Sequence, residues 1–124
     1  MKNLYAKLLK VQREIKAIVK DEVNPHFKNT YFNINGLLAE LKPILNANKL
    51  VVIQPIIVYE GKMALQTTVI DFESGEKMES YILLPENNNP QQIGSAITYY
   101  RRYALQSLFL LEAEDDDGNL ASQK

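Results

Sequence analysis

The chain has 124 residues, of which 46% are hydrophobic and 23% are charged, and it contains no cysteine. This composition is typical of one globular domain with its own core, and it excludes disulfides and thiolate metal sites. The longest apolar stretches, residues 50–53 and 56–59, are too short to span a bilayer, and lysines interrupt the N-terminal segment where a signal peptide would be apolar. We therefore expect a cytoplasmic protein that contacts no membrane.

The formal net charge of −1 hides an uneven distribution. Residues 1–49 hold nine basic and four acidic residues, whereas five acids gather at Glu112, Glu114, Asp115, Asp116 and Asp117. A basic front supplies a local track for phosphate groups, although a solvated helix face followed by a solubilising tail is the simpler explanation. We expect a single domain over residues 1–111 and an acidic tail over residues 112–124.

The first predicted element is an amphipathic helix over residues 3–21. Its apolar side chains recur at helical spacing on one face: Leu4, Leu8, Val11, Ile15 and Ile18. Cations follow a second stripe of the same helix: Lys2, Arg13, Lys16 and Lys20. Asn24-Pro25 and the aromatic stretch that follows predict a loop and a short strand before residue 34.

A second helix is predicted over residues 34–48, where Asn33 is suited to cap its start. Its apolar face holds Leu37, Leu38, Leu41, Ile44 and Leu45. Pro43 should kink this helix or split it in two. Asn48 is suited to a left-handed conformation at its end.

Three strands and a last helix follow. The strands are predicted over residues 50–59, 62–72 and 76–84, with tight turns at Glu60-Gly61 and Ser74-Gly75 and with Pro55 at an edge or a bulge. Asn89, Pro90 and Gln92 have the pattern of a helix start, which predicts a helix over residues 90–111. The order predicts an α+β domain: N-terminal helix, short strand, second helix, three-stranded antiparallel meander and long C-terminal helix, with the helices on one face of the sheet.

The residues that carry common catalytic chemistry are sparse. His26 is the sole histidine, no Gly-Xaa-Ser-Xaa-Gly motif occurs, and no phosphate-binding glycine loop occurs. The acidic run does not fit the spacing of a calcium loop. We therefore expect no catalytic residue, no metal, no cofactor and no ATP hydrolysis. A nuclease that uses the acidic run to bind a metal is the enzymatic alternative.

The last helix carries the strongest signal. Ile93, Ile97, Tyr100, Ala104, Leu108 and Leu111 line one face, and Leu105, Phe109 and Leu110 fall on the opposite side. A helix that is apolar nearly all round is buried by more than its own sheet, for example at a subunit contact. Tyr99, Tyr100, Arg101, Arg102 and Tyr103 combine aromatic rings with cations, which suits single-stranded nucleic acid. Tyrosines at helical spacing also suit a core, and the arginines suit ion pairs with acids such as Glu112.

Several strings resemble one known family. The most specific is GSAITYYRRYAL at residues 94–105, followed by DDD at 115–117. Weaker matches are NPHFKNTYF at 24–32, LKPIL at 41–45, Gln54, and DFESGE at 71–76. In this order and spacing the chain resembles the ERF (essential recombination function) family of phage and prophage single-strand annealing proteins. Asn48 stands where that family usually has glycine.

The resemblance implies single-stranded DNA binding and annealing of complementary strands without ATP, in rings or filaments of identical subunits. It also implies an annealed duplex intermediate, and a phage exonuclease or host single-strand-binding protein as further partners. We assign DNA phosphate contacts to Lys28, Arg101 and Arg102, outer contacts to Lys16 and Lys20, and stacking to Tyr31 and Tyr99. Packing between subunits is assigned to Gly94, Ser95, Ala96, Tyr100 and Tyr103. The alternative is an oligomeric structural or protein-interaction module of a phage that does not bind DNA.

Overall fold

The computed structural model describes residues 1–15, 34–86 and 89–111. Its elements, in chain order, are α1 (Lys2–Ile15), α2 (Ile34–Ala47), β1 (Leu50–Ile53), β2 (Ile56–Tyr59), β3 (Lys62–Asp71), β4 (Lys77–Leu83) and α3 (Pro90–Leu108). The predicted end of the first helix, the loop and short strand before residue 34, and the acidic tail lie outside the described residues. The predicted α+β class is confirmed.

The sheet is antiparallel and β3 is its central strand. β4 pairs with one side of β3, while β1 and β2 both pair with the other side. The step from Ile53 to Ile56 equals the step from Thr68 to Leu65 on β3, so the register continues through the gap between β1 and β2. The gap contains Pro55, which has no N–H to donate to the ladder. The predicted strand over residues 50–59 is therefore one strand line that is interrupted at its proline.

The turns between the strands follow their local sequence. Glu60 and Gly61 have φ angles of 51° and 79°, and they join the paired residues Tyr59 and Lys62. Positive φ at both central residues is the two-residue turn that matches the twist of a hairpin. Gly75 has a φ of 79° in the turn that joins β3 to β4. Both predicted turns are confirmed.

The helices differ from prediction at their ends. α2 runs through Pro43 as one helix, so of the two predicted effects of this proline, a kink or a split, the split does not occur. The left-handed residue after α2 is Lys49, with φ 55°, rather than Asn48, whose side-chain amide donates instead to the Ile44 carbonyl at 2.8 Å. Asn48 is therefore buried, where its side chain satisfies a carbonyl of the last helical turn. Lys49, the next residue, adopts the left-handed conformation that turns the chain.

α3 ends at Leu108 instead of residue 111. Leu110 adopts a φ of 54°, and the N–H groups of Leu110 and Leu111 bond to the carbonyls of Ser107 and Gln106. These two bonds form a Schellman motif, which closes the helix without the usual glycine. Among the described residues, no helix is long and apolar enough to cross a membrane.

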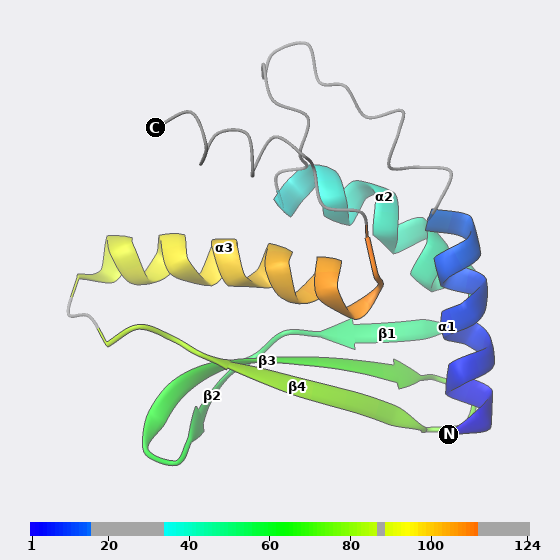
Figure 1. The fold of residues 1–124 in the computed structure, drawn as a ribbon, viewed down its shortest axis with the longest axis horizontal. Helices are drawn as coiled ribbons and strands as arrows, with labels where there is room; N and C mark the ends of the chain where they lie inside the picture. The colour runs from blue at the N-terminus through cyan, green and yellow to red at the C-terminus, as the bar shows by residue number, and fades with distance from the viewer. Residues whose placement is uncertain (16–33, 87–88, 112–124) are drawn as a thin grey trace, which may run out of the picture.

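The core lies between the sheet and the helices: α2 and α3 lie over one side of the sheet, and α1 runs across the ends of the strands (Figure 1). α1 contributes Leu4, Val11 and Ile15 as predicted. α3 contributes Leu105 and Phe109, each 1% exposed. The sequence analysis placed both on the far side of that helix, and this assignment is wrong. α3 packs against both β3 and α2, so its C-terminal half is enclosed from more than one direction.

Candidate nucleic-acid interface

A groove of about 580 Å³ opens between α2, the β1–β2 strand line and α3. Its lining is mostly apolar, and its polar side chains are Lys42, Asn46, Gln54 and Arg101. The apolar side chains come from all three elements: Leu38, Leu41, Leu45, Leu50, Ile56, Ile97 and Leu105 among them. The groove therefore offers apolar surface and two cations in one concave place.

Arg101 reaches the groove because it lies on the same side of α3 as Ile97 and Leu105, four residues before and after it. Lys42 enters the groove from α2, on the other wall. Neither cation forms an ion pair with an acid among the residues that the structure describes. Within those described residues, no carboxylate neutralises either cation.

Gln54 connects the floor of the groove to α3. Its side-chain amide donates to the Thr67 hydroxyl at 3.0 Å and to the backbone carbonyl of Arg101 at 3.3 Å. Gln54 stands next to Pro55, where β1 and β2 are interrupted. The amide thus ties the sheet to the turn of α3 that carries Arg101.

Arg102 points into a different and smaller cavity, of about 260 Å³, lined also by Ile34, Ser95, Thr98 and Tyr99. Its guanidinium lies over the rings of Tyr99 and Tyr103, at 5.6 and 5.2 Å from their centroids. Successive residues of a helix are about 100° apart, and the two arginines diverge as that angle predicts. Arg101 and Arg102 therefore do not form one cationic patch.

The tyrosines of α3 form a single cluster with Arg102. The ring of Tyr99 lies 4.4 Å from that of Tyr103 and 5.5 Å from that of Tyr100, centroid to centroid. The sequence analysis assigned Tyr99 to DNA stacking and Tyr100 and Tyr103 to assembly. The structure brings the three rings together, so DNA and a neighbouring subunit would contact the same surface.

The small residues at the start of α3 are open to their surroundings. Gly94 and Ser95 are exposed, and Ala96 is half-buried. A Cβ added to Gly94 would meet no described atom within 4 Å. Packing among the described residues therefore does not require a glycine at position 94, and the assignment of all three residues to a subunit contact stays a prediction.

Four assigned DNA contacts lie outside the described residues: Lys16, Lys20, Lys28 and Tyr31. His26 and the acidic run lie outside them as well. Within the described ranges, no group of three or more His, Cys, Asp or Glu side chains could hold a metal ion. The sequence analysis missed Lys42 as a groove residue, although it lies inside the LKPIL string.

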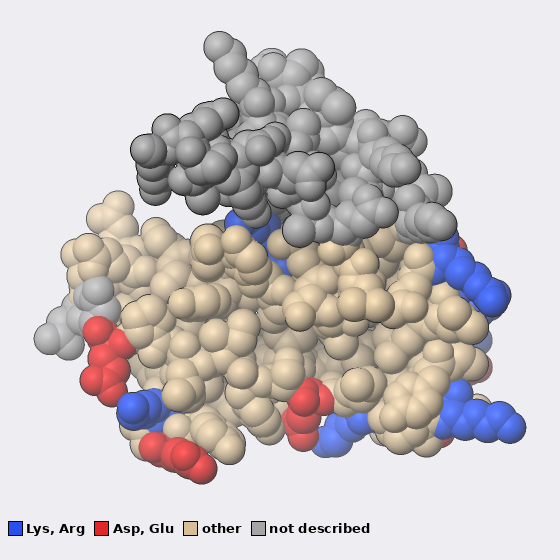
Figure 2. Space-filling model, viewed as in Figure 1, with Lys and Arg blue, Asp and Glu red and all other residues tan. Residues whose placement is uncertain are grey.

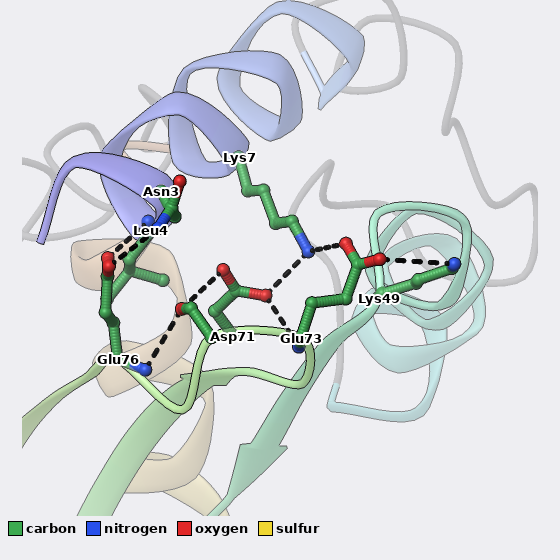
Figure 3. Close-up of polar contacts among 8 residues, drawn as sticks. Asn3, Leu4, Lys7, Lys49, Asp71, Glu73 and Glu76 are labelled. Atoms are coloured by element: carbon green, nitrogen blue, oxygen red, sulfur yellow. Dashed lines mark hydrogen bonds and ion pairs between the residues drawn. The ribbon is translucent and has the colours of Figure 1, made fainter.

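Lys7 and Lys49, unlike the cations of the groove, form ion pairs with acids. Lys7 Nζ lies 2.6 Å from Asp71 Oδ1 and 2.8 Å from Glu73 Oε1, and Lys49 Nζ lies 3.4 Å from Glu73 Oε2 (Figure 3). Asp71 also accepts from the Ser74 hydroxyl and the Glu73 N–H. We refer to Lys7, Lys49, Asp71, Glu73 and Glu76 as the α1 anchor.

The α1 anchor holds the helix by its charges. The hydrogen bond from Lys7 lowers the pKa of Asp71 to about 2, and the hydrogen bonds from Asp71 and Glu73 raise the pKa of Lys7. Glu76 accepts from the Leu4 N–H at 2.9 Å, which lowers the pKa of that carboxyl. α1 has no acid in its own first turn, so Glu76 supplies the negative charge that a helix N-terminus favours. The DFESGE string thus has a structural role.

The surface shows no extended basic patch from one side. In Figure 2 the acidic and basic side chains occupy small separate areas, and most of the visible described surface is neither. The groove is distinguished by its shape and by its two cations, not by a high local density of charge.

Comparison with known proteins agrees with the resemblance noted in the sequence. The family model of the ERF superfamily matches residues 4–124, which is nearly the whole chain. Searches of curated proteins and of solved structures found no significant match. The matched range includes all of α2, the four strands and α3, which carry the groove, and most of α1. The chain belongs to the ERF superfamily.

Proposed function

We propose that this protein binds single-stranded DNA and anneals complementary strands without ATP, in phage homologous recombination. The observation that carries the proposal is the groove between the sheet and the helices, with Arg101 and Lys42 on facing walls. Membership of the ERF superfamily supports the same function.

The groove suits an unpaired strand chemically. Its cations neutralise phosphates, and its apolar lining offers surface to bases or sugars that are not enclosed in a duplex. Because a duplex of complementary strands is more stable than the separate strands, annealing needs no covalent step and no nucleotide hydrolysis. The protein has to reduce phosphate repulsion and keep base edges accessible until pairing begins.

The two arginines have different roles in this proposal. Arg101 contacts the strand in the groove, whereas Arg102 stacks on Tyr99 and Tyr103 and orders the aromatic cluster. Lys7 and Lys49 are excluded as principal DNA contacts because acids of the α1 anchor already neutralise them. Lys16, Lys20, Lys28 and Tyr31 remain proposed contacts.

The test is fluorescence-monitored annealing of complementary oligonucleotides in the absence of ATP. The double variant Arg101→Ala with Lys42→Ala should anneal about a hundredfold more slowly at a limiting protein concentration, because each lost charge-assisted contact is worth about 1.5 kcal/mol and about 1.4 kcal/mol is a factor of ten. The matched control is Lys62→Ala with Lys77→Ala, which removes two exposed cations from the strands outside the groove. Equal loss in both double variants would contradict the assignment of the groove.

Sedimentation with and without an oligonucleotide separates this function from a purely structural one. A complex whose sedimentation coefficient rises with oligonucleotide at low salt supports the proposal. An oligomer that is indifferent to oligonucleotide under those conditions would contradict it and favour the structural module.

A further inference from the structure

The side-chain amide of Gln54 has a fixed orientation at the floor of the groove. Its nitrogen donates to the Thr67 hydroxyl and to the Arg101 carbonyl, which uses both of its N–H groups. The amide oxygen, Oε1, accepts from no donor among the residues that the structure describes, and it is not enclosed by them. Because Gln54 lines the groove, a hydrogen-bond acceptor is accessible there.

The other polar side chains of the groove supply donors. Arg101 on α3 and Lys42 on α2 carry N–H donors and no acceptor. Asn46, also on α2 and exposed, adds an amide that can donate. A phosphate group, which has only acceptor oxygens, can bind the two cations but cannot donate to Gln54 Oε1. The floor of the groove therefore favours a ligand group that carries an N–H or O–H donor.

A DNA strand carries such donors only on its bases. Within the strand, the phosphodiesters and deoxyriboses present acceptor oxygens, whereas each base has at least one N–H group. RNA differs because its ribose 2′-hydroxyl can also donate. If the ligand is DNA, the group that bonds to Gln54 Oε1 is therefore a base.

The size and the walls of the groove also suit a base. Its volume of about 580 Å³ falls within the range of about 300–1,000 Å³ that is usual for pockets that enclose compact organic groups. Ile97 and Leu105 of α3 line one wall. Leu38 and Leu41 of α2 line the other. Apolar walls on two sides offer contact to both faces of a planar ring, which a site for phosphate alone does not need.

We propose that the groove binds one unstacked base of the strand, whose N–H donates to Gln54 Oε1, while Arg101 and Lys42 contact the adjoining phosphates. This inference rests on the proposed function, since it takes the ligand to be DNA. The bases on either side of the bound base keep their edges accessible for pairing.

The contact makes the groove selective for an unpaired strand. Thymine presents no donor in either groove of a duplex, and its one N–H, at N3, lies on its pairing edge. A thymine bound to Gln54 through N3–H therefore cannot be paired at the same time. The groove binds the base while the strand is single and releases it as the duplex forms.

Methylation of thymine N3 tests the contact, because it removes the one donor and keeps the ring. Fluorescence anisotropy compares a short oligo(dT) with the same strand built from N3-methylthymidine. The wild type should bind oligo(dT) about tenfold more tightly, a difference of about 1.4 kcal/mol, since the methylated base leaves the acceptor without its hydrogen bond.

Variants of two glutamines on the sheet assign the effect to one residue. Gln54→Leu should reduce the ratio of the two affinities to about one. The matched control, Gln66→Leu, removes a glutamine amide that bonds to Thr68 and Glu79, and it should keep the ratio near ten. Each ratio is measured within one variant, so a loss of stability or a shift of Arg101 that weakens both strands equally does not change it.

The other outcomes separate this inference from the proposed function. Equal affinity of the wild type for the two strands overturns the inference and leaves single-strand binding in place. Failure to bind either strand contradicts the proposed function itself. A tenfold ratio that persists in Gln54→Leu overturns the inference, because N3–H is then bound elsewhere. The ribose form of the methylated strand serves as the last probe. If it binds more tightly than the deoxyribose form in the wild type but not in Gln54→Leu, Oε1 accepts from a 2′-hydroxyl of RNA and the inference is overturned.

Discussion

The α1 anchor and the groove use the same kinds of basic side chain for opposite purposes. In the anchor, Lys7 lies within 2.8 Å of two carboxylates, and one of them, Asp71, has a side chain that is 1% exposed. In the groove, Arg101 and Lys42 have no acidic partner among the described residues and line a cavity of about 580 Å³. In the α1 anchor, the charge of Lys7 is paired with acids and holds α1 in place. In the groove, the charges of Arg101 and Lys42 are not paired with any described acid.

The difference teaches that charge counted along a sequence does not locate a binding surface. Nine basic residues fall within residues 1–49, yet two of them, Lys7 and Lys49, are neutralised by acids more than twenty positions away in the chain. Arg101 comes from a later and less basic region, and it lines the groove without an acidic partner among the described residues. Whether a basic side chain can bind an anionic ligand depends on whether an acid lies close enough to neutralise it.

The largest effect should come from the packing beneath α3. Phe109→Ala should lower the free energy of unfolding by about 3–5 kcal/mol, because it leaves a cavity in the core that α1, α2 and α3 share. Leu110→Ala, at a side chain that is 74% exposed, should change it by less than about 0.5 kcal/mol. Chemical denaturation measures both. Similar losses would mean that Phe109 does not anchor the helix.

Acid should act on the α1 anchor before it acts on the groove. The pKa of Asp71 is lower in the folded chain, about 2, than its ordinary value of 3.8, so the unfolded chain binds more protons between these values. The stability that Asp71 contributes is therefore complete above about pH 4 and is lost as the pH falls toward 2. Urea denaturation across this window should show a smaller pH dependence for Asp71→Asn than for the wild type. An unchanged pH dependence would contradict the role of Asp71.

A smaller difference, in oligonucleotide affinity, is expected between variants of Gln54 and Gln66, two glutamines whose side chains make similar hydrogen bonds. Gln54→Leu removes the link from the sheet to the Arg101 carbonyl and should cost about 1 kcal/mol of stability together with some oligonucleotide affinity. Gln66→Leu removes bonds to Thr68 and Glu79 on the face of the sheet that points away from the core, and it should leave oligonucleotide affinity unchanged. Fluorescence anisotropy compares the two variants. A loss of affinity in Gln66→Leu alone would reverse the comparison.

Local patterns in the sequence predicted most of the fold. Apolar stretches separated by turn residues predicted the strands, Glu60-Gly61 predicted its turn, and Asn89 accepts from two N–H groups at the start of α3 as its position suggested. The errors arose where tertiary contacts decide. The face of α3 that enters the core depends on where α2 lies, and the C-terminus of α3 depends on Leu110 adopting a left-handed conformation.

The candidate site was predicted only in part. Arg101 was identified from its neighbours in α3, and its divergence from Arg102 followed from helical geometry. The partnership of Lys7 with Asp71 joins residues 64 positions apart, so no local pattern reveals it. Lys42 could be recognised as a groove residue only after α2 was placed against α3 and the β1–β2 strand line.

The most direct test of the account is the salt dependence of oligonucleotide affinity. Arg101→Ala should reduce the slope of log affinity against log salt concentration by about 0.7, the value of one lost phosphate contact on a single strand. Lys7→Ala removes the same charge from the α1 anchor and should leave that slope unchanged while it lowers stability. Equal reductions in the two variants, or a reduction in Lys7→Ala alone, would contradict the assignment of the groove as the DNA-binding site.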